Sequence, residues 1–273
     1  MEPNFFHSVL LICQFELKRL FSTKKGWLYL ITFAVVWYFI LIYPIRFAAE
    51  VLSRSQNGAQ GANFFDFIGF GSLLNWQIPK FGVFWRFALV MFPALSVMIA
   101  ADQSCSDRER GTLRFIVLRS SRDSIFFGRF SGAMVIQALL ILAALLTTLA
   151  LVVYRDGNLL SLALNSALAI AVSLSLALLP FTAMMAALSA TVKSARQATV
   201  WAILIWSFLA GIISGLSNYL PGLDIMKILI PGYQMAELSQ LSEWKTLQLA
   251  YIPLLQTAVL LIIGRWIMSR QAL

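Results

Sequence analysis

The sequence predicts an all-α membrane protein with six transmembrane helices, and its composition and hydropathy pattern carry this prediction. Hydrophobic residues make up 60% of the 273-residue chain and charged residues 12%, whereas soluble domains have about 45–50% and about 25%. Mean hydropathy is +0.80. A soluble domain of this length has too little interior to bury so much apolar surface. The apolar residues also gather into six runs near the length of about 20 residues that a membrane-spanning helix needs.

The N-terminal segment, residues 1–25, has the pattern of an amphipathic helix that lies in the membrane interface. Its apolar residues recur at helical spacing, and its charged residues fall elsewhere or just beyond them. A simple extension of the first span is the alternative interpretation. A secretory signal is not expected, because Glu16, Lys18 and Arg19 lie in the segment and no small-residue cleavage site follows the first span.

The spans are expected within a single transmembrane domain that covers residues 1–273. The fourth span is long enough to tilt or to kink at Pro180. The six ranges are 26–47, 82–101, 130–154, 159–192, 198–220 and 247–263.

Two segments between spans have distinctive sequences. Residues 48–81 become rich in aromatic side chains, which fits an interfacial lid or, more simply, an aromatic girdle at the membrane surface. Between spans five and six, a short apolar stretch is too short to span and is bounded by two Pro-Gly pairs; it consists of Ile225, Ile228, Leu229 and Ile230. This pattern predicts a re-entrant or interfacial segment.

The distribution of positive charge predicts the orientation. Fourteen of the 21 Lys and Arg residues fall on one side of the six spans and seven on the other, and the richer side is normally cytoplasmic. An even number of spans then places both termini in the cytoplasm. The net charge of +9 is explained by orientation and by contact with the lipid bilayer. No nucleic-acid partner is expected, because no soluble basic module is left over.

Several classes of chemistry are disfavoured by what the spans lack. Five of the six span interiors contain no Asp, Glu, Lys, Arg or His, and proton-driven carriers usually need such residues at mid-membrane depth. The single histidine, His7, lies outside the spans, which argues against haem and against a histidine-pair metal site. No P-loop is present. We therefore expect a non-catalytic chain with no cofactor or metal of its own.

The loop between spans two and three, residues 104–128, is the most informative segment. It combines dense charge of both signs with an apolar stripe made of Leu113, Ile116 and Val117. This pattern is typical of a short helix that lies along the membrane and presents charge to a cytoplasmic partner. An ordinary positively charged loop is the alternative, and the acids mixed among the arginines favour the partner.

Three motifs in this loop together carry a resemblance to a known family. Glu109-Arg110-Gly111-Thr112-Leu113, then Ser121-Arg122, then Gly128-Arg129 resemble the signature of ABC type-2 permeases, the membrane subunits of ATP-driven exporters. Two departures stand out: Ser120-Ser121 replaces the family's proline turn, and Arg129 replaces its lysine. Ile230-Pro231-Gly232-Tyr233, before the last span, is also similar to a family feature.

The resemblance implies a permease subunit of a bacterial exporter in the inner (plasma) membrane. Its coupling helix, between spans two and three, would contact a separate ATPase subunit that binds ATP and Mg. Two ATPase subunits and a second permease subunit, identical or different, would complete the assembly. Lys193 and Arg196 would lie on the same cytoplasmic face. The coupling residues would be Asp107, Arg108, Glu109, Arg110, Gly111, Thr112, Leu113 and Arg114.

The sequence leaves the substrate and its direction of movement open. A different class of function also stays possible, in which the ATPase drives a shape change toward a periplasmic partner and no solute crosses. An ATP-independent channel or carrier is disfavoured by the uncharged span interiors.

Overall fold

The computed structural model describes residues 5–48, 76–154, 157–217 and 227–270. The described residues form helices and turns without a strand, and six of their helices are long and apolar enough to cross a membrane. The predicted fold class is therefore confirmed. In chain order the elements are α1 (Phe5–Ser22), α2 (Lys24–Ile40), η1 (Leu41–Ala48), α5 (Pro79–Ala100), α6 (Cys105–Glu109), α7 (Leu113–Val117), α8 (Arg122–Val153), η3 (Gly157–Leu159), α9 (Leu160–Thr191), α10 (Ala195–Ser217), α11 (Met235–Leu238), η5 (Glu243–Leu249) and α12 (Tyr251–Arg270).

Local sequence sets several helix ends. The Thr23 side chain accepts a hydrogen bond from the Gly26 N–H, 3.1 Å away, and so caps the start of α2. Ser121 caps α8 by accepting from the Ser124 N–H at 3.1 Å. Pro79 occupies the first position of α5, where a missing N–H is harmless. Pro44 lies in the wide π-helical turn η1 that continues α2, and it has no N–H to offer to an intrahelical hydrogen bond.

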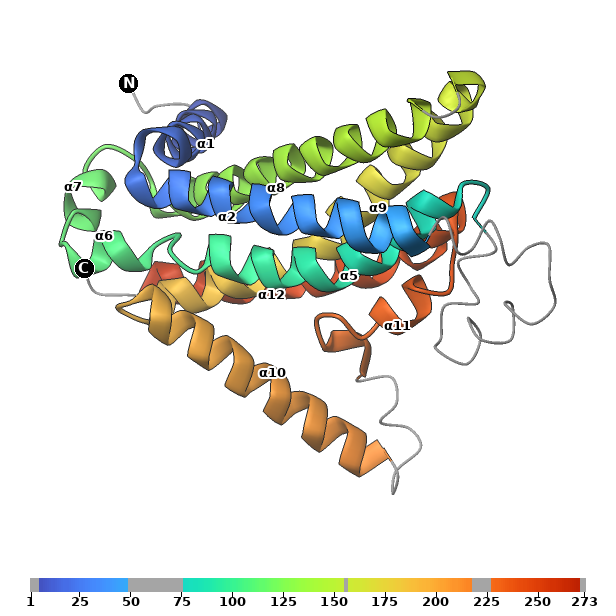
Figure 1. Cartoon of the computed structure of the whole chain (residues 1–273). Coiled ribbons are helices and arrows are strands. Elements are labelled where there is room, and N and C mark those ends of the chain that lie inside the picture. The colour runs from blue at the N-terminus through green and yellow to red at the C-terminus, as the bar shows by residue number, and fades with distance from the viewer. Residues whose placement is uncertain (1–4, 49–75, 155–156, 218–226, 271–273) are drawn as a thin grey trace.

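The long helices form a bundle around α9, as Figure 1 shows. α5, α8 and α12 pack against α9, α2 covers one side, and α10 diverges from the others. α1 packs across α8 and is not among the six spanning helices. The short helices α6 and α7 lie at the same end of the bundle as α1 and the end of α12, and α11 lies toward the opposite end (Figure 1).

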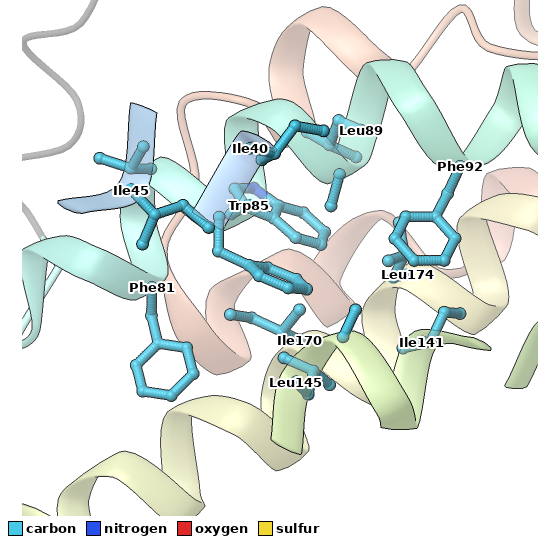
Figure 2. Packing of buried hydrophobic residues seen from close by; sticks show 14 of the residues in the cluster. Ile40, Ile45, Phe81, Trp85, Leu89, Phe92, Ile141, Leu145, Ile170 and Leu174 are labelled. Carbon is cyan, nitrogen blue, oxygen red and sulfur yellow. The ribbon is translucent and has the colours of Figure 1, made fainter. Parts of the chain in front are cut away.

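The main hydrophobic core joins α5 to α8 and α9 (Figure 2). Trp85 and Phe92 of α5 are almost fully buried, and Ile141 of α8 and Leu174 of α9 belong to the same cluster. The indole N–H of Trp85 also donates to the Leu238 carbonyl at 2.9 Å. This bond ties α11 to α5.

A buried polar triad joins three spans within the bundle. Gln137 of α8 donates to Ser96 Oγ of α5 at 3.1 Å and accepts from Thr182 Oγ1 of α9 at 3.1 Å. The Ser96 and Thr182 hydroxyls are also 3.0 Å apart. Such mutual satisfaction is how polar groups inside membrane bundles hold helices together.

Two helices differ in extent from the expected spans. α8 begins at Arg122, ahead of residue 130, because Ser121 supplies an N-cap and the helix runs beyond the apolar stretch. α12 covers Tyr251–Arg270 instead of 247–263, since η5 occupies the earlier positions. Its last turns are stabilised by Arg265, which lies 2.7 Å from Asp123 of α8.

Parts of four predicted segments fall outside the described residues: 1–4 of the N-terminal segment, 49–75 of the aromatic segment, 218–220 of the fifth span, and 225–226 of the re-entrant stretch. Residues 227–229 form a 3-10 turn. Gln256 of α12 donates to the carbonyls of Ile228 and Ile230, at 2.6 and 2.9 Å. The described part of the stretch is thus held against α12, and re-entry into the bilayer stays a prediction.

Candidate coupling site

Two short helices, α6 and α7, connect α5 to α8, and this connecting segment is the candidate site. Residues 101–104 lead from α5 into α6, and Gly111 separates α6 from α7. Gly111 has φ of +69°, in the left-handed region that favours glycine. Ser121 then starts α8, so the Ser-Ser pair that replaces the family's proline turn provides the helix cap.

Asp107 is the central anchor of this segment. One carboxylate oxygen accepts from Thr112 Oγ1 at 3.0 Å, and the other accepts from the Arg129 guanidinium of α8. Burial by itself would raise the pKa of Asp107, but Arg129 and Thr112 outweigh it and hold that pKa below its ordinary value. Asp107 is therefore ionised at neutral pH and ties the segment to a span.

A second group of charges connects α1 to the start of the α6–α7 segment. Arg19 lies 3.1 Å from Asp102, at the end of α5, and 3.6 Å from Glu16 one turn earlier. Burial raises the pKa of Glu16, although Arg129 and Arg19 oppose the shift. The carboxylates and guanidiniums of α1, α6 and α8 thus lie within one electrostatic cluster.

Close packing of α1 on α8 brings these charges together. A Cβ at Gly128 would lie 2.8 Å from the Ile12 Cβ, and a Cβ at Gly132 would lie 2.9 Å from the Glu16 Cβ. Glycine at both positions therefore lets the two helices approach.

The remaining anchors are a thiol and an apolar side chain. Cys105 is fully buried, and its Sγ lies 3.4 Å from the Ser189 carbonyl of α9. Burial raises the pKa of Cys105 to about 11, so this thiol stays protonated. Leu113 is 2% exposed and packs in a cluster with Phe126 and Met268.

The eight residues predicted to couple to a partner thus divide into three groups. Asp107, Thr112 and Leu113 face the protein and fix the segment. Arg108 and Gly111 are half-buried, and the exposed members are Glu109, Arg110 and Arg114.

Three more exposed residues, which were not predicted to couple to a partner, follow Arg114 in the chain. Phe115 is 72% exposed and Leu118 is 83% exposed, and Arg119 beside them is also exposed. We call Glu109, Arg114, Phe115, Leu118 and Arg119 the outward surface, and the exposed Arg110 lines a cavity with α1 instead. The outward surface combines charge with apolar side chains, which is the composition of a protein-binding patch.

Lys193 and Arg196 are exposed and lie in and just after the turn between α9 and α10. Cys105 of α6 packs in one cluster with Met185 of α9 and Ala198 of α10. This turn therefore lies at the same end of the bundle as α6 (Figure 1).

Sequence reasoning missed four charged residues of the site: Glu16, Arg19, Asp102 and Arg129. Arg129 belongs to the Gly128-Arg129 motif, and the sequence predicts it as a loop charge. The structure instead places it inside α8 with 3% exposure. Its position directly after Gly128 could have indicated burial, because a side chain next to a close contact between helices has little access to water. The α1 charges gave no comparable signal, since Asp102, the partner of Arg19 outside α1, is 83 residues away in sequence.

Comparison with known proteins identifies a family but finds no similar curated protein. The profile of the family described as ABC-2 family transporter protein matches residues 10–272. No curated protein matches the chain.

Proposed function

The chain belongs to the ABC-2 family of transporter proteins, and from this premise we propose that it is the permease of a bacterial exporter driven through the α6–α7 segment. Members of this family are membrane subunits that associate with an ABC ATPase and are generally non-catalytic. The chain is a multi-pass membrane permease subunit. Its docking surface, direction of transport and assembly are the proposal.

One observation carries the proposal: some side chains anchor the α6–α7 segment to the bundle, while others, including Phe115 and Leu118, are exposed along an open cavity shared with α1. Asp107 and Cys105 connect the segment to α8 and α9, while Phe115 and Leu118 lie exposed. Exposed apolar side chains among charges are typical of a surface that a partner covers. We place the ATPase subunit on this outward surface, within residues 104–128.

The anchors explain how such a partner would move the spans. The segment is covalently continuous with α5 and α8, and the Asp107–Arg129 contact joins its middle to α8 as well. Cys105 adds a contact to α9. A shift of the ATPase would therefore displace the segment as a rigid body and pull on three spans together.

The rest of the assembly follows from the same proposal. Two ATPase subunits bind ATP and Mg, and this chain needs no cofactor or metal of its own. A second permease subunit, identical or different, packs against α10, whose Trp201 and Phe208 are 51% and 69% exposed. The segment end of the bundle, with both termini, faces the cytoplasm, and the membrane is the bacterial inner membrane. Lys193 and Arg196 border the ATPase there.

A mechanical role, in which the ATPase drives a shape change toward a periplasmic partner, shares the same coupling segment. It differs at the opposite end of the bundle, around α11. Cross-linking from that end that captures no periplasmic protein would leave solute transport as the function.

The outward surface can be tested by substitution with matched controls. Phe115→Ala and Glu109→Ala should reduce the ATPase subunit that co-purifies with the permease by about tenfold, which corresponds to about 1.4 kcal/mol. Phe6→Ala is the apolar control, because Phe6 is 83% exposed and belongs to α1 and not to the segment. Lys18→Ala, exposed on the same helix, is the charged control.

The readouts are the molar ratio of ATPase to permease and the ATP hydrolysis of the complex. Both controls should match the wild type, and all variants should insert at wild-type levels. Undiminished co-purification and hydrolysis in Phe115→Ala and Glu109→Ala would exclude the outward surface as the docking site.

A further inference from the structure

A charged cavity of about 290 Å³ lies where α1, α2, α5 and α8 meet. Four cationic side chains and two carboxylates line it, so its lining is net positive. They are Arg19, Lys24, Arg110, Arg129, Glu16 and Asp102. The charges at the mouth favour an anionic ligand.

Arg129, which lines this cavity, has two buried donors without a partner among the described residues. Its side chain is 3% exposed, and one nitrogen, Nη2, donates to Asp107. Its Nε and Nη1 have no hydrogen-bond partner among the described residues. Either N–H group can donate to a phosphate oxygen as a charge-assisted hydrogen bond.

Glu16 supplies an unused acceptor beside these donors. Its Oε1 is buried and has no hydrogen-bond partner in the described part of the chain. A ligand that satisfies both residues carries a phosphate for Arg129 and a hydroxyl donor for Glu16. Buried polar groups left without partners are unfavourable, so such a ligand would stabilise the site.

An apolar chamber of about 210 Å³ adjoins the charged cavity. Leu20, Tyr29, Ile99 and Ile136 line both spaces, so the two are neighbours. The remaining lining is almost entirely apolar and comes mainly from α2 and α5, with aromatic side chains among it.

This chamber is open to the side of the bundle. Ala94 and Met98, which line it from α5, are exposed. Val36 faces it from α2 and is 40% exposed. An acyl chain could therefore enter from the bilayer while its headgroup stays at the interface.

We propose that this cleft binds one anionic glycerophospholipid with a hydroxyl-bearing head, of the phosphatidylglycerol type. The phosphate lies at Arg129, the head hydroxyl donates to Glu16, and one acyl chain occupies the chamber between α2 and α5. The lipid comes from the leaflet on the side of the α6–α7 segment. The proposal does not depend on what the protein transports.

The test is native mass spectrometry of the full-length chain in detergent with defined lipids. Phosphatidylglycerol, phosphatidylethanolamine and phosphatidylcholine with identical acyl chains are compared by titration. We expect one phosphatidylglycerol per chain, bound at least about tenfold more tightly than phosphatidylcholine. Equal retention of the three lipids would overturn the headgroup assignment.

Substitutions test the headgroup site and the acyl-chain chamber separately. Ala94→Phe fills the chamber and should weaken phosphatidylglycerol binding by about tenfold, whereas Val90→Phe, one turn away and 68% exposed outside the chamber, should not. Lys24→Gln should reduce the preference for phosphatidylglycerol several-fold, and Lys18→Gln should leave it unchanged. These exposed positions keep the test independent of whether an Arg129 variant folds.

Inorganic phosphate and glycerol phosphate distinguish a lipid from a free phosphate. Neither, at 10 mM, should displace the bound phosphatidylglycerol. Displacement by either compound would show that the cleft holds a phosphate group without an acyl chain. Wild-type lipid binding in Ala94→Phe would show that the chamber does not hold the acyl chain. Either result would overturn the proposal.

Discussion

Replacing Asp107 with Asn removes the charge that holds the α6–α7 segment to α8 and leaves the shape of the side chain unchanged. Arg129 is 3% exposed and Asp107 is 21% exposed, so the substitution strands a buried guanidinium. Removing one partner of a fully buried ion pair costs about 3–5 kcal/mol. Because water reaches Asp107, we expect a loss of about 2–3 kcal/mol in the free energy of unfolding.

The pH dependence has a definite sign. The pKa of Asp107 in the folded protein lies below its ordinary value of 3.8, so the carboxylate stabilises the fold fully above that value. The difference between wild type and Asp107→Asn should therefore be constant near neutral pH and shrink as the pH falls below 3.8 toward the folded pKa.

The assay is unfolding by increasing SDS in mixed micelles, followed by tryptophan fluorescence. Asp107→Asn should unfold at a lower SDS fraction, and the double variant with Arg129→Met should recover most of the loss, because no buried charge is then left alone. An unchanged midpoint in Asp107→Asn would refute the view that this pair anchors the segment.

Two further predictions concern the packing of α1. Gly128→Leu should lower the free energy of unfolding by about 1–3 kcal/mol, because its Cβ would lie 2.8 Å from the Ile12 Cβ. Gly211→Leu is its control, since a Cβ there meets nothing within 4 Å, and a change of more than about 0.5 kcal/mol in the control would contradict the argument. Glu16→Gln should not lower the free energy of unfolding at neutral pH. The raised pKa of Glu16 means that its ionised carboxylate destabilises the fold. In the wild type, the free energy of unfolding should therefore rise as the pH falls through the pKa that Glu16 has in the folded protein. Melting curves of this variant should therefore lack that gain on acidification, and a strongly lowered melting temperature at pH 7.5 would show the ionised form to be stabilising.

The spans could be predicted from sequence because bilayer thickness imposes a length and a composition on each helix. Helix ends were less predictable, since they depend on caps and distant partners. Ser121 extends α8 backward past its apolar stretch, and Arg265 meets Asp123 near the end of α12. Neither contact is visible in a hydropathy pattern.

The candidate site was predicted in outline for a similar reason. Local charge density located the α6–α7 segment, but the division into anchoring and exposed residues depends on tertiary contacts. Thr112 and Asp107 are five residues apart and still form one anchor, whereas Arg19 meets Asp102 across 83 residues. Sequence alone could not show that α1 belongs to the site.

The most direct test of the central claim is purification of the tagged full-length chain from native membranes in mild detergent. Mass spectrometry and light scattering would then identify its partners and their molar ratio. The account predicts an ATPase with a P-loop at about one copy per permease, released by the Phe115→Ala substitution and retained in Phe6→Ala. Recovery of monodisperse, well-folded permease with no ATPase, from membranes that contain one, would contradict it.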